Sequence, residues 1–174
     1  RGGRGAEGGG TELVLDERHV TTGSLADLAV WAKRGDRRVP LSVDLEITAR
    51  CNNDCRHCYI NLPAGDAEAR RRELSCAEIG GILDQAASLG TMFCTLTGGE
   101  PLLRDDFADI YMMVRKKGLL VSLFTNACLV TPELAAMLKR YPPRETEVTV
   151  YGVTEETYER VTRRPGAFEA FRRG

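Results

Sequence analysis

Three cysteines lie within eight positions of the chain and are the residues best suited to bind a metal centre. Cys51, Cys55 and Cys58 have the spacing C-x3-C-x2-C. Thiolates are soft ligands, and a loop with this spacing can wrap three sulfurs around one compact inorganic centre. The other cysteines do not extend this run, and we interpret them as small buried side chains: Cys76, Cys94 and Cys128.

The number of cysteines in this loop narrows the choice of metal centre. A structural zinc site closes on four ligands, usually in two pairs, and no second pair follows here. Ordinary ferredoxin spacing supplies a fourth cysteine. An iron-sulfur cube held by three cysteines would leave one iron open to a substrate or cofactor. His57 is a candidate zinc ligand, although its place between Cys55 and Cys58 would strain a loop of four ligands.

A second motif, Gly98-Gly99-Glu100-Pro101, follows a short apolar segment over residues 92–97. Two adjacent glycines permit a close approach of the backbone that side chains would block. Taken alone, the glycine pair is also compatible with a simple turn, and Glu100 with an acidic residue in the first turn of a helix.

The hydrophobic pattern places both motifs directly after predicted strands. Residues 41–47 alternate apolar and polar side chains and predict a strand that runs into the cysteine loop. Further strands are predicted over residues 92–97, 119–124 and 147–151. A long loop is expected over residues 61–72.

A helix is predicted after each strand. The first begins at Ser75, where Glu78 completes a capping box, and ends at Gly90. Asp105 opens the second helix, and Thr131 followed by a proline opens the third. The predicted helices after the first lie at residues 105–118, 131–138 and 154–161.

Four strands, each followed by a helix, predict an α/β fold with a mostly parallel sheet and right-handed crossovers. The pattern is compatible with a doubly wound sheet or with part of a (βα) barrel, and in both folds the chemistry occurs at the carboxyl ends of the strands. Those ends hold the cysteine loop, the Gly98–Pro101 motif, Thr125-Asn126 and Tyr151-Gly152. We therefore expect these residues to meet at one rim.

Composition excludes several classes of protein. The 174 residues carry 24 Lys and Arg against 25 Asp and Glu, and the formal net charge of −1 gives no basic field for a nucleic acid. No apolar run approaches the roughly 20 residues that span a bilayer. With 43% hydrophobic residues, the composition is typical of a soluble globular protein. We expect no nucleic-acid or membrane partner.

The chain divides into three predicted segments. Residues 1–23 form a glycine-rich tail expected to be flexible, residues 24–40 a lead-in helix and linker, and residues 41–174 the core domain. We interpret the chain as a fragment whose core domain is incomplete at its C-terminus. A cytoplasmic location is expected, because no secretory hydrophobic region precedes the first strand.

Together, the two motifs closely resemble those of the radical S-adenosylmethionine (SAM) superfamily. Both match without gaps, and the similarity covers roughly residues 39–171. Further details resemble the peptide- and protein-modifying branch, whose members often carry a SPASM domain: His57-Cys58-Tyr59, Thr125-Asn126 and Tyr151-Gly152. The resemblance implies a partial (βα) TIM-like barrel, truncated after about four βα units.

The resemblance also implies an activity and its cofactors. Cys51, Cys55 and Cys58 would bind a 4Fe-4S cluster, SAM would chelate the fourth iron, and one electron would cleave the sulfonium. The resulting 5′-deoxyadenosyl radical would abstract hydrogen from a substrate, expected to be a peptide or protein side chain. The expected electron donor is a low-potential protein of the flavodoxin or ferredoxin type.

Further residues take roles in SAM binding from the same resemblance. Gly98 and Gly99 would let the backbone approach the methionine moiety, and Glu100 would place an anion near the SAM ammonium. Pro101 would limit the backbone where the chain turns. Residues expected to pack near adenine or to contact SAM complete the set: His57, Tyr59, Asn126 and Thr149.

The sequence departs from the family pattern at two places. Many relatives have a glycine where this chain has Ala127, so a turn that needs positive φ would be strained there. Some relatives have an arginine near position 162 that meets the SAM carboxylate, and only Arg160 or Arg163 could replace it. A zinc-binding or iron-sulfur electron-transfer module without SAM chemistry is the alternative hypothesis, and we expect the fragment by itself to be inactive.

Overall fold

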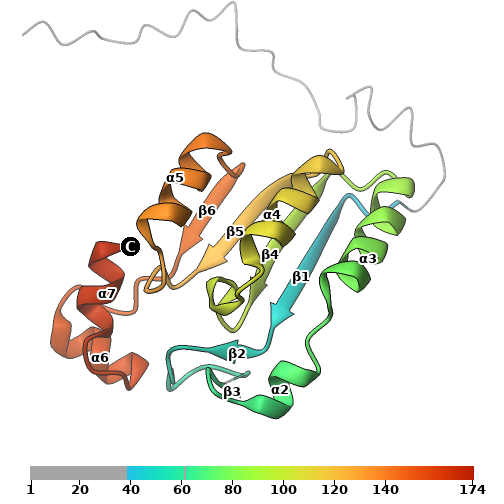
Figure 1. The fold of residues 1–174 in the computed structure, drawn as a ribbon. Helices are drawn as coiled ribbons and strands as arrows, with labels where there is room; N and C mark the ends of the chain where they lie inside the picture. Colours follow the sequence, from blue (N-terminus) through green and yellow to red (C-terminus); the bar gives the residue numbers. More distant parts are fainter. Residues whose placement is uncertain (1–38, 61) are drawn as a thin grey trace, which may run out of the picture. The chain divides into compact units, whose positions relative to one another are not determined.

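The computed structural model of the protein describes residues 39–60 and 62–174 (Figure 1). The glycine-rich tail predicted over residues 1–23 and the helix predicted within residues 24–40 lie outside these ranges.

Four parallel strands form the main sheet, and their order in space follows their order in sequence. The strands are β1 (Ser42–Thr48), β4 (Phe93–Gly98), β5 (Leu120–Thr125) and β6 (Glu145–Val148), in the order β1-β4-β5-β6. A doubly wound sheet reverses its strand order and carries helices on both faces. Here the order does not reverse, and the helices between strands cover one face (Figure 1). The α/β prediction is confirmed, and the arrangement is that of a partial (βα) barrel.

The fourth strand lies earlier in the chain than its sequence pattern indicates. The prediction over residues 147–151 was wrong by two or three residues, because β6 pairs with β5 from Glu145 to Val148. All four residues of β6 are exposed, so the alternation of buried and exposed side chains that marks a strand is missing. Thr149 therefore follows the strand instead of lying within it.

The connecting helices pack an apolar core against the sheet. They are α3 (Cys76–Ser88), α4 (Phe107–Lys116) and α5 (Pro132–Arg140). The capping box predicted for α3 is present, since Ser75 accepts from the Glu78 N–H and the Glu78 carboxylate accepts from the Ser75 N–H. The most deeply buried apolar residues come from α3, α4 and the strands, and include Leu83, Ile110, Val114, Cys94 and Leu96. This core fixes the strands whose ends carry both motifs.

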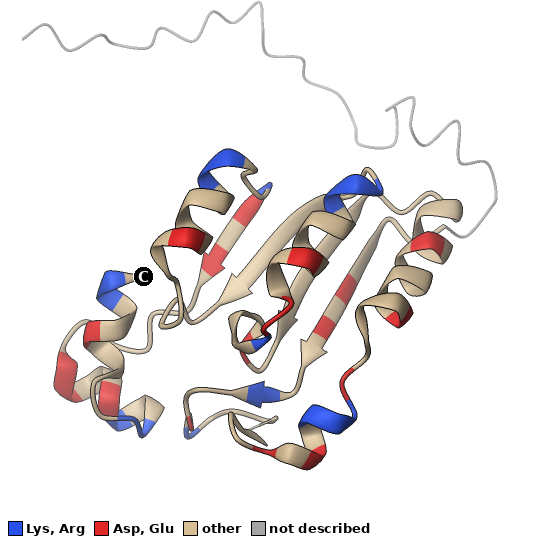
Figure 2. Cartoon of the chain, viewed as in Figure 1, with Lys and Arg blue, Asp and Glu red and all other residues tan. Residues whose placement is uncertain are grey.

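The other face of the sheet is polar in its outer strands. Asp44 and Glu46 on β1, and Glu145 and Glu147 on β6, are exposed and alternate with the side chains that face the helices. Figure 2 shows acidic bands along both strands. Since apolar side chains of the central strands point toward the helices, this sheet separates an apolar layer from a polar one.

Two elements break up the loop predicted over residues 61–72. Strand β3 (Leu62–Pro63) pairs in parallel with β2 (Arg50–Cys51), and helix α2 (Ala67–Arg71) follows. Asp66 caps this helix by accepting from the Ala69 N–H at 2.8 Å. The loop prediction was wrong here because a helix of five residues is too short to show a helical repeat of apolar positions.

Two helices, where one was predicted, follow β6. They are α6 (Glu155–Thr162), which begins at its cap Thr154 as expected, and α7 (Ala167–Arg173), which the sequence pattern did not indicate. Arg163 adopts φ 52° and ends α6, and Gly166 at φ 77° precedes α7. Tyr158 of α6 stacks on Phe171 of α7 at 5.0 Å between ring centroids. Among the described residues, no helix is long and apolar enough to span a bilayer.

Candidate active site

The three cysteines lie on one loop at the carboxyl end of β1, and this loop is held by helix α6 and the residues that follow it. Cys51 ends β2, Cys55 is buried, and Cys58 follows a turn in which its N–H donates to the Cys55 carbonyl at 3.0 Å. The N–H groups of Asp54 and Arg56 donate to carbonyls of α6 at 2.9 and 3.0 Å. The loop is therefore fixed by backbone contacts more than 100 residues apart in the chain.

Cys51 has a polar and partly buried environment. Its sulfur accepts from the Asn53 N–H at 3.4 Å, and the Asn126 side-chain amide lies within donor distance at 3.7 Å. Burial raises the pKa of Cys51 to about 11, and the nearby Glu100, Cys55 and Cys58 add to this effect. Binding of a metal centre must displace this proton, because the thiolate is the ligand.

Burial also raises the pKa of Cys55, and a hydrogen bond from Tyr151 opposes the shift. The rings of Tyr151 and His57 lie 5.6 Å apart, and Tyr151 meets Tyr158 edge-on at 5.5 Å. His57 thus belongs to an aromatic group that runs from the cysteine loop into α6. Sequence reasoning did not assign Tyr151 a contact with the cysteines, because nothing in its spacing relates it to them.

The three thiols of the cysteine loop are chemically suited to hold an iron-sulfur cluster. Across residues 39–60 and 62–174, no group of three or more His, Cys, Asp or Glu side chains is arranged as a site for a metal ion. The loop does present three thiols, with an N–H donor directed at the first. Asn52 Nδ2 and Asn53 Oδ1 are buried beside them without a hydrogen-bond partner, which is uncommon unless an ion or ligand satisfies such groups.

The Gly98–Pro101 motif packs directly against the base of the cysteine loop. The Gly99 N–H donates to the Thr48 carbonyl at 2.8 Å, and the Glu100 N–H donates to the Arg50 carbonyl at 2.9 Å. Gly98 adopts φ 140°, and a Cβ on Gly98 or Gly99 would overlap the carbonyl oxygen of Thr48 or Arg50. Both glycines are therefore required by the chain's own contacts, whatever else approaches them.

Glu100 is fully buried and connects the motif to the end of β5. Its carboxylate accepts from the Leu102 N–H at 3.1 Å, the Thr125 hydroxyl at 2.7 Å and the Asn126 N–H at 2.7 Å. Burial raises the pKa of Glu100, and these three hydrogen bonds oppose that shift. Pro101 is buried at the start of the short 3-10 helix η3 (Pro101–Leu103).

Asn126 joins both motifs. Its side-chain amide donates to Asn52 Oδ1 at 2.8 Å, and its Oδ1 accepts from the Cys128 N–H at 2.9 Å. Ala127 adopts φ 61°, which confirms the positive φ expected there. For a residue with a Cβ, this conformation costs about 1–2 kcal/mol.

Two predicted contact residues lie apart from this group. Tyr59 is 84% exposed, and its hydroxyl donates to Glu46 of β1 at 2.8 Å. Thr149 is exposed after β6, where its N–H donates to the Thr125 carbonyl at 3.3 Å. The described residues thus bring Cys51, Glu100 and Asn126 together, whereas Tyr59 and Thr149 stand at the margin.

An arginine that sequence reasoning passed over contacts the cysteine loop. The Arg164 guanidinium donates to the Asn52 carbonyl at 3.0 Å and lines a cavity of about 220 Å³ with Cys51. Arg163 also reaches the loop, since it pairs with Asp54 at 3.6 Å and lines the same cavity. Arg160 instead pairs with Glu156 at 3.4 Å. No sequence signal could single out Arg164, because its partner lies 112 positions earlier.

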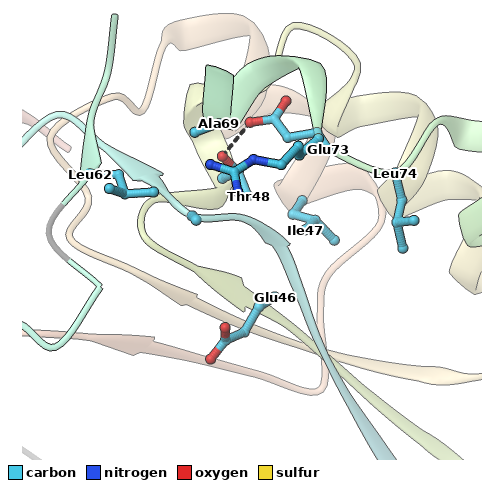
Figure 3. Close-up of a pocket in the computed structure, with 9 residues that line it drawn as sticks. Glu46, Ile47, Thr48, Leu62, Ala69, Glu73 and Leu74 are labelled. Atoms are coloured by element: carbon cyan, nitrogen blue, oxygen red, sulfur yellow. Dashed lines mark hydrogen bonds between the residues drawn. The ribbon is translucent and has the colours of Figure 1, made fainter. Parts of the chain in front are cut away.

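A second cavity, of about 340 Å³, lies between the end of β1 and α2. Figure 3 shows Glu73 reaching Thr48 across it, while Glu46 lies apart from them. Thr48 donates from its hydroxyl to Glu73 at 2.5 Å. This cavity is bounded by the segment that carries the loop, and it contains none of the predicted site residues.

Comparison with known proteins identifies a family. The sequence model of the radical SAM superfamily matches residues 45–174. The AdoMet-dependent heme synthase of Methanosarcina barkeri is 36% identical over 134 residues, which cover 75% of this chain and 36% of that protein. The PqqA peptide cyclase of Gluconobacter oxydans is 30% identical over 128 residues, covering 74% of this chain and 35% of that protein.

A solved structure shares the fold. The crystal structure of Streptococcus suis SuiB bound to S-adenosylmethionine superposes with a TM-score of 0.58 at 17% identity, covering 76% of this chain and 30% of that one. The chain spans about a third of the length of the curated relatives that it matches.

Proposed function

The chain belongs to the radical SAM superfamily, and from this premise we propose that its cysteine loop holds a 4Fe-4S cluster at which SAM is cleaved reductively. When bound, the cluster and SAM supply a 5′-deoxyadenosyl radical that abstracts hydrogen from a substrate. Cys51, Cys55 and Cys58 would each hold one iron. The observation that carries this proposal is the connection from Cys51 through Asn126 to Glu100, because it joins both motifs at one rim.

The residues around this rim would bind and orient SAM. Glu100 would face the SAM ammonium, since its three hydrogen bonds leave acceptor capacity on a carboxylate with about four lone-pair sites. Gly98 and Gly99 would keep that edge of the sheet free of side chains, and Pro101 would fix the turn that follows them.

The remaining aromatic and polar residues would complete the site. His57, which packs against Tyr151, would form one wall near adenine, and Tyr59 would extend it. Asn126 and Thr149 would hydrogen-bond to SAM from the ends of β5 and β6. Water would be excluded on this side by the packing of α6 against the cysteine loop.

We further propose a peptide or protein side chain as the substrate. The similarity to the PqqA peptide cyclase supports this class, whereas the similar heme synthase is named for a different product. A low-potential protein of the flavodoxin or ferredoxin type would supply the electron that reductive cleavage of SAM consumes.

Anaerobic reconstitution tests the cluster and the cleavage together. The full-length protein that contains this chain, loaded with iron and sulfide, should contain about four iron atoms at this site and should convert SAM to 5′-deoxyadenosine when dithionite is added. Chromatography with mass detection measures this product. A loaded protein that forms no 5′-deoxyadenosine would refute the proposed activity. A colourless protein that contains one zinc ion per chain would favour the alternative zinc module.

A matched pair of cysteine variants locates the cluster. Cys51→Ser should lose most of the bound iron, because serine is a poor ligand for this centre. Cys76→Ser should retain it, since Cys76 lies on α3 and donates to Asp106 at 3.2 Å, away from the loop. Equal iron content in the two variants would show that Cys51 is not a ligand.

A further inference from the structure

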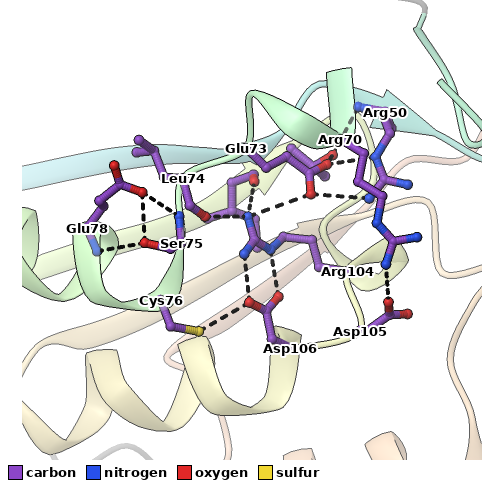
Figure 4. Close-up of polar contacts among 12 residues, drawn as sticks. Arg50, Arg70, Glu73, Leu74, Ser75, Cys76, Glu78, Arg104, Asp105 and Asp106 are labelled. Carbon is purple, nitrogen blue, oxygen red and sulfur yellow. Dashed lines mark hydrogen bonds and ion pairs between the residues drawn. The ribbon is translucent and has the colours of Figure 1, made fainter. Parts of the chain in front are cut away.

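Two buried arginines flank the two motifs. Arg50 directly precedes Cys51, and Arg104 follows η3 at the end of the Gly98–Pro101 motif. Their side chains are 7% and 6% exposed. Figure 4 shows both guanidinium groups turned toward Glu73 of the segment between α2 and α3. Buried arginines need partners, and these two share one.

Glu73 holds the cysteine side of this group. Arg50 donates from Nε to Glu73 Oε1 at 2.7 Å and from a terminal nitrogen to Oε2 at 3.2 Å, a bidentate pair. Its other terminal nitrogen donates to the Ala64 carbonyl at 2.8 Å. The Thr48 hydroxyl adds a hydrogen bond to Oε1. Together these hydrogen bonds fix Arg50, the residue just before the first cysteine.

Arg104 holds the side of the second motif. Its guanidinium lies 3.9 Å from Glu73 Oε2 and donates to the carbonyls of Ile47 and Leu74, both at 2.9 Å. Asp106 accepts from it twice, each time at 2.7 Å. Arg104 therefore links the end of β1, the start of α3 and the segment that follows Pro101.

Backbone contacts connect these side chains to the proposed SAM site. Arg50 and Thr48 contact Glu73 through their side chains, and their carbonyls accept the N–H groups of Glu100 and Gly99. A shift of the β1–β2 segment would therefore move the Gly98–Pro101 motif relative to Cys51.

The environment of Glu73 favours its negatively charged form. Burial alone would raise its pKa, but hydrogen bonds from Arg50 and Thr48, with the charges of Arg50 and Arg104, lower it overall. The carboxylate is thus ionised at neutral pH, and its side chain is only 12% exposed. Replacing one partner of such a group leaves a buried charge uncompensated.

We propose that Glu73 is a positioning residue that sets the spacing between the cysteine loop and the Gly98–Pro101 motif and thereby tunes the affinity for SAM. This inference rests on the proposed function for its ligand. Glu73 does not contact the rim itself and acts through Arg50 and Arg104. Its role is comparable to that of outer groups that orient metal ligands, whose loss typically reduces affinity or activity by 10–100-fold.

The test compares Glu73→Gln with Asp105→Asn. The first variant keeps the shape of the side chain and removes its charge. The second removes an exposed carboxylate of the neighbouring surface that pairs with Arg70 at 2.7 Å, with both side chains more than half exposed. Hydrogen exchange of the Gly99 and Glu100 amides, measured in the metal-free protein, should accelerate in Glu73→Gln and stay unchanged in Asp105→Asn.

The second readout is SAM binding by the reconstituted protein, followed by the change in its paramagnetic resonance spectrum. The dissociation constant for SAM should rise about tenfold in Glu73→Gln and be unchanged in Asp105→Asn. Unchanged affinity in Glu73→Gln would overturn the inference, even if amide exchange rises. Unchanged amide exchange in Glu73→Gln would also refute the positioning role. The proposed function is tested separately, because it fails if the unmodified loaded protein does not respond to SAM.

Discussion

Single residues at the rim of the sheet serve the chain's own packing as well as the proposed chemistry. Gly99 lies against the Arg50 carbonyl, and Glu100 is fully buried with three donors around its carboxylate. Both features would be needed to hold β1, β4 and β5 together at this end. A substitution here therefore affects stability before it affects SAM binding, and the two effects must be measured separately.

We predict that Gly99→Ala strongly destabilises the fold. A Cβ at Gly99 would overlap the backbone of Arg50, which cannot move without disturbing β2. We therefore expect a loss of about 1–3 kcal/mol, the usual range for overpacking. Urea unfolding measures it.

Gly81→Ala is the matched control for this substitution. Gly81 lies within α3, where no atom stands within 4 Å of an added Cβ, so alanine should stabilise the helix by up to about 1 kcal/mol. Equal unfolding midpoints for the two variants would contradict the steric argument.

At the scale of elements, the start of α4 is fixed by an ion pair and not by a side-chain cap. Asp106 occupies the N-cap position, but its carboxylate makes no capping hydrogen bond and instead accepts from Arg104. The hydrogen bonds that the Arg104 guanidinium donates lower the pKa of Asp106 from 3.8 to about 2, and burial opposes this shift. Helix α4 is thereby tied to β1 and α3 through one guanidinium.

This ion pair predicts a loss of stability in acid. A carboxyl group with a lowered pKa in the folded chain stabilises it fully above the ordinary value of 3.8, and this contribution disappears as the pH falls to about 2. The urea midpoint of the unmodified protein should therefore decrease over this range. Asp106→Asn should lower the urea midpoint at neutral pH and should make the midpoint depend less on pH in acid. A variant whose midpoint falls in acid as steeply as that of the unmodified protein would contradict the assignment.

At the scale of the whole molecule, α6 and the residue Arg164 near the C-terminal end hold the cysteine loop, which follows the first strand. Two backbone hydrogen bonds from the cysteine loop end on α6, and Arg164 donates to the Asn52 carbonyl. The aromatic group around Tyr158 fixes α6 against α7. The proposed cluster site is thus assembled from the loop that follows β1 and from α6 with the residues just after it.

We predict that Arg164→Ala loosens the cysteine loop and that Arg160→Ala does not. Arg164 contacts the loop, whereas Arg160 pairs with Glu156 on the exposed side of α6. Amide exchange of residues 51–58 in the metal-free protein should accelerate only in Arg164→Ala, and this variant should retain less iron after reconstitution. Identical exchange in both variants would show that the backbone contacts to α6 hold the loop without Arg164.

The sequence by itself determined the family and the α/β class, and it named the residues that we propose carry the chemistry. These depend on local signals: the spacing of Cys51, Cys55 and Cys58, the Gly98–Pro101 motif, the capping box at Ser75 and the positive φ at Ala127. Each can be read within a few residues, because spacing, capping and backbone conformation are properties of short segments.

Only the tertiary structure decided which distant residues meet. Helices α2 and α7 were missed, because five and seven residues give too few turns for an apolar repeat. The contacts of Glu73 with two arginines, and of Arg164 with Asn52, join residues 23 to 112 positions apart. Ionic partners carry no periodicity along a chain, so packing alone selects them from among its many charged residues.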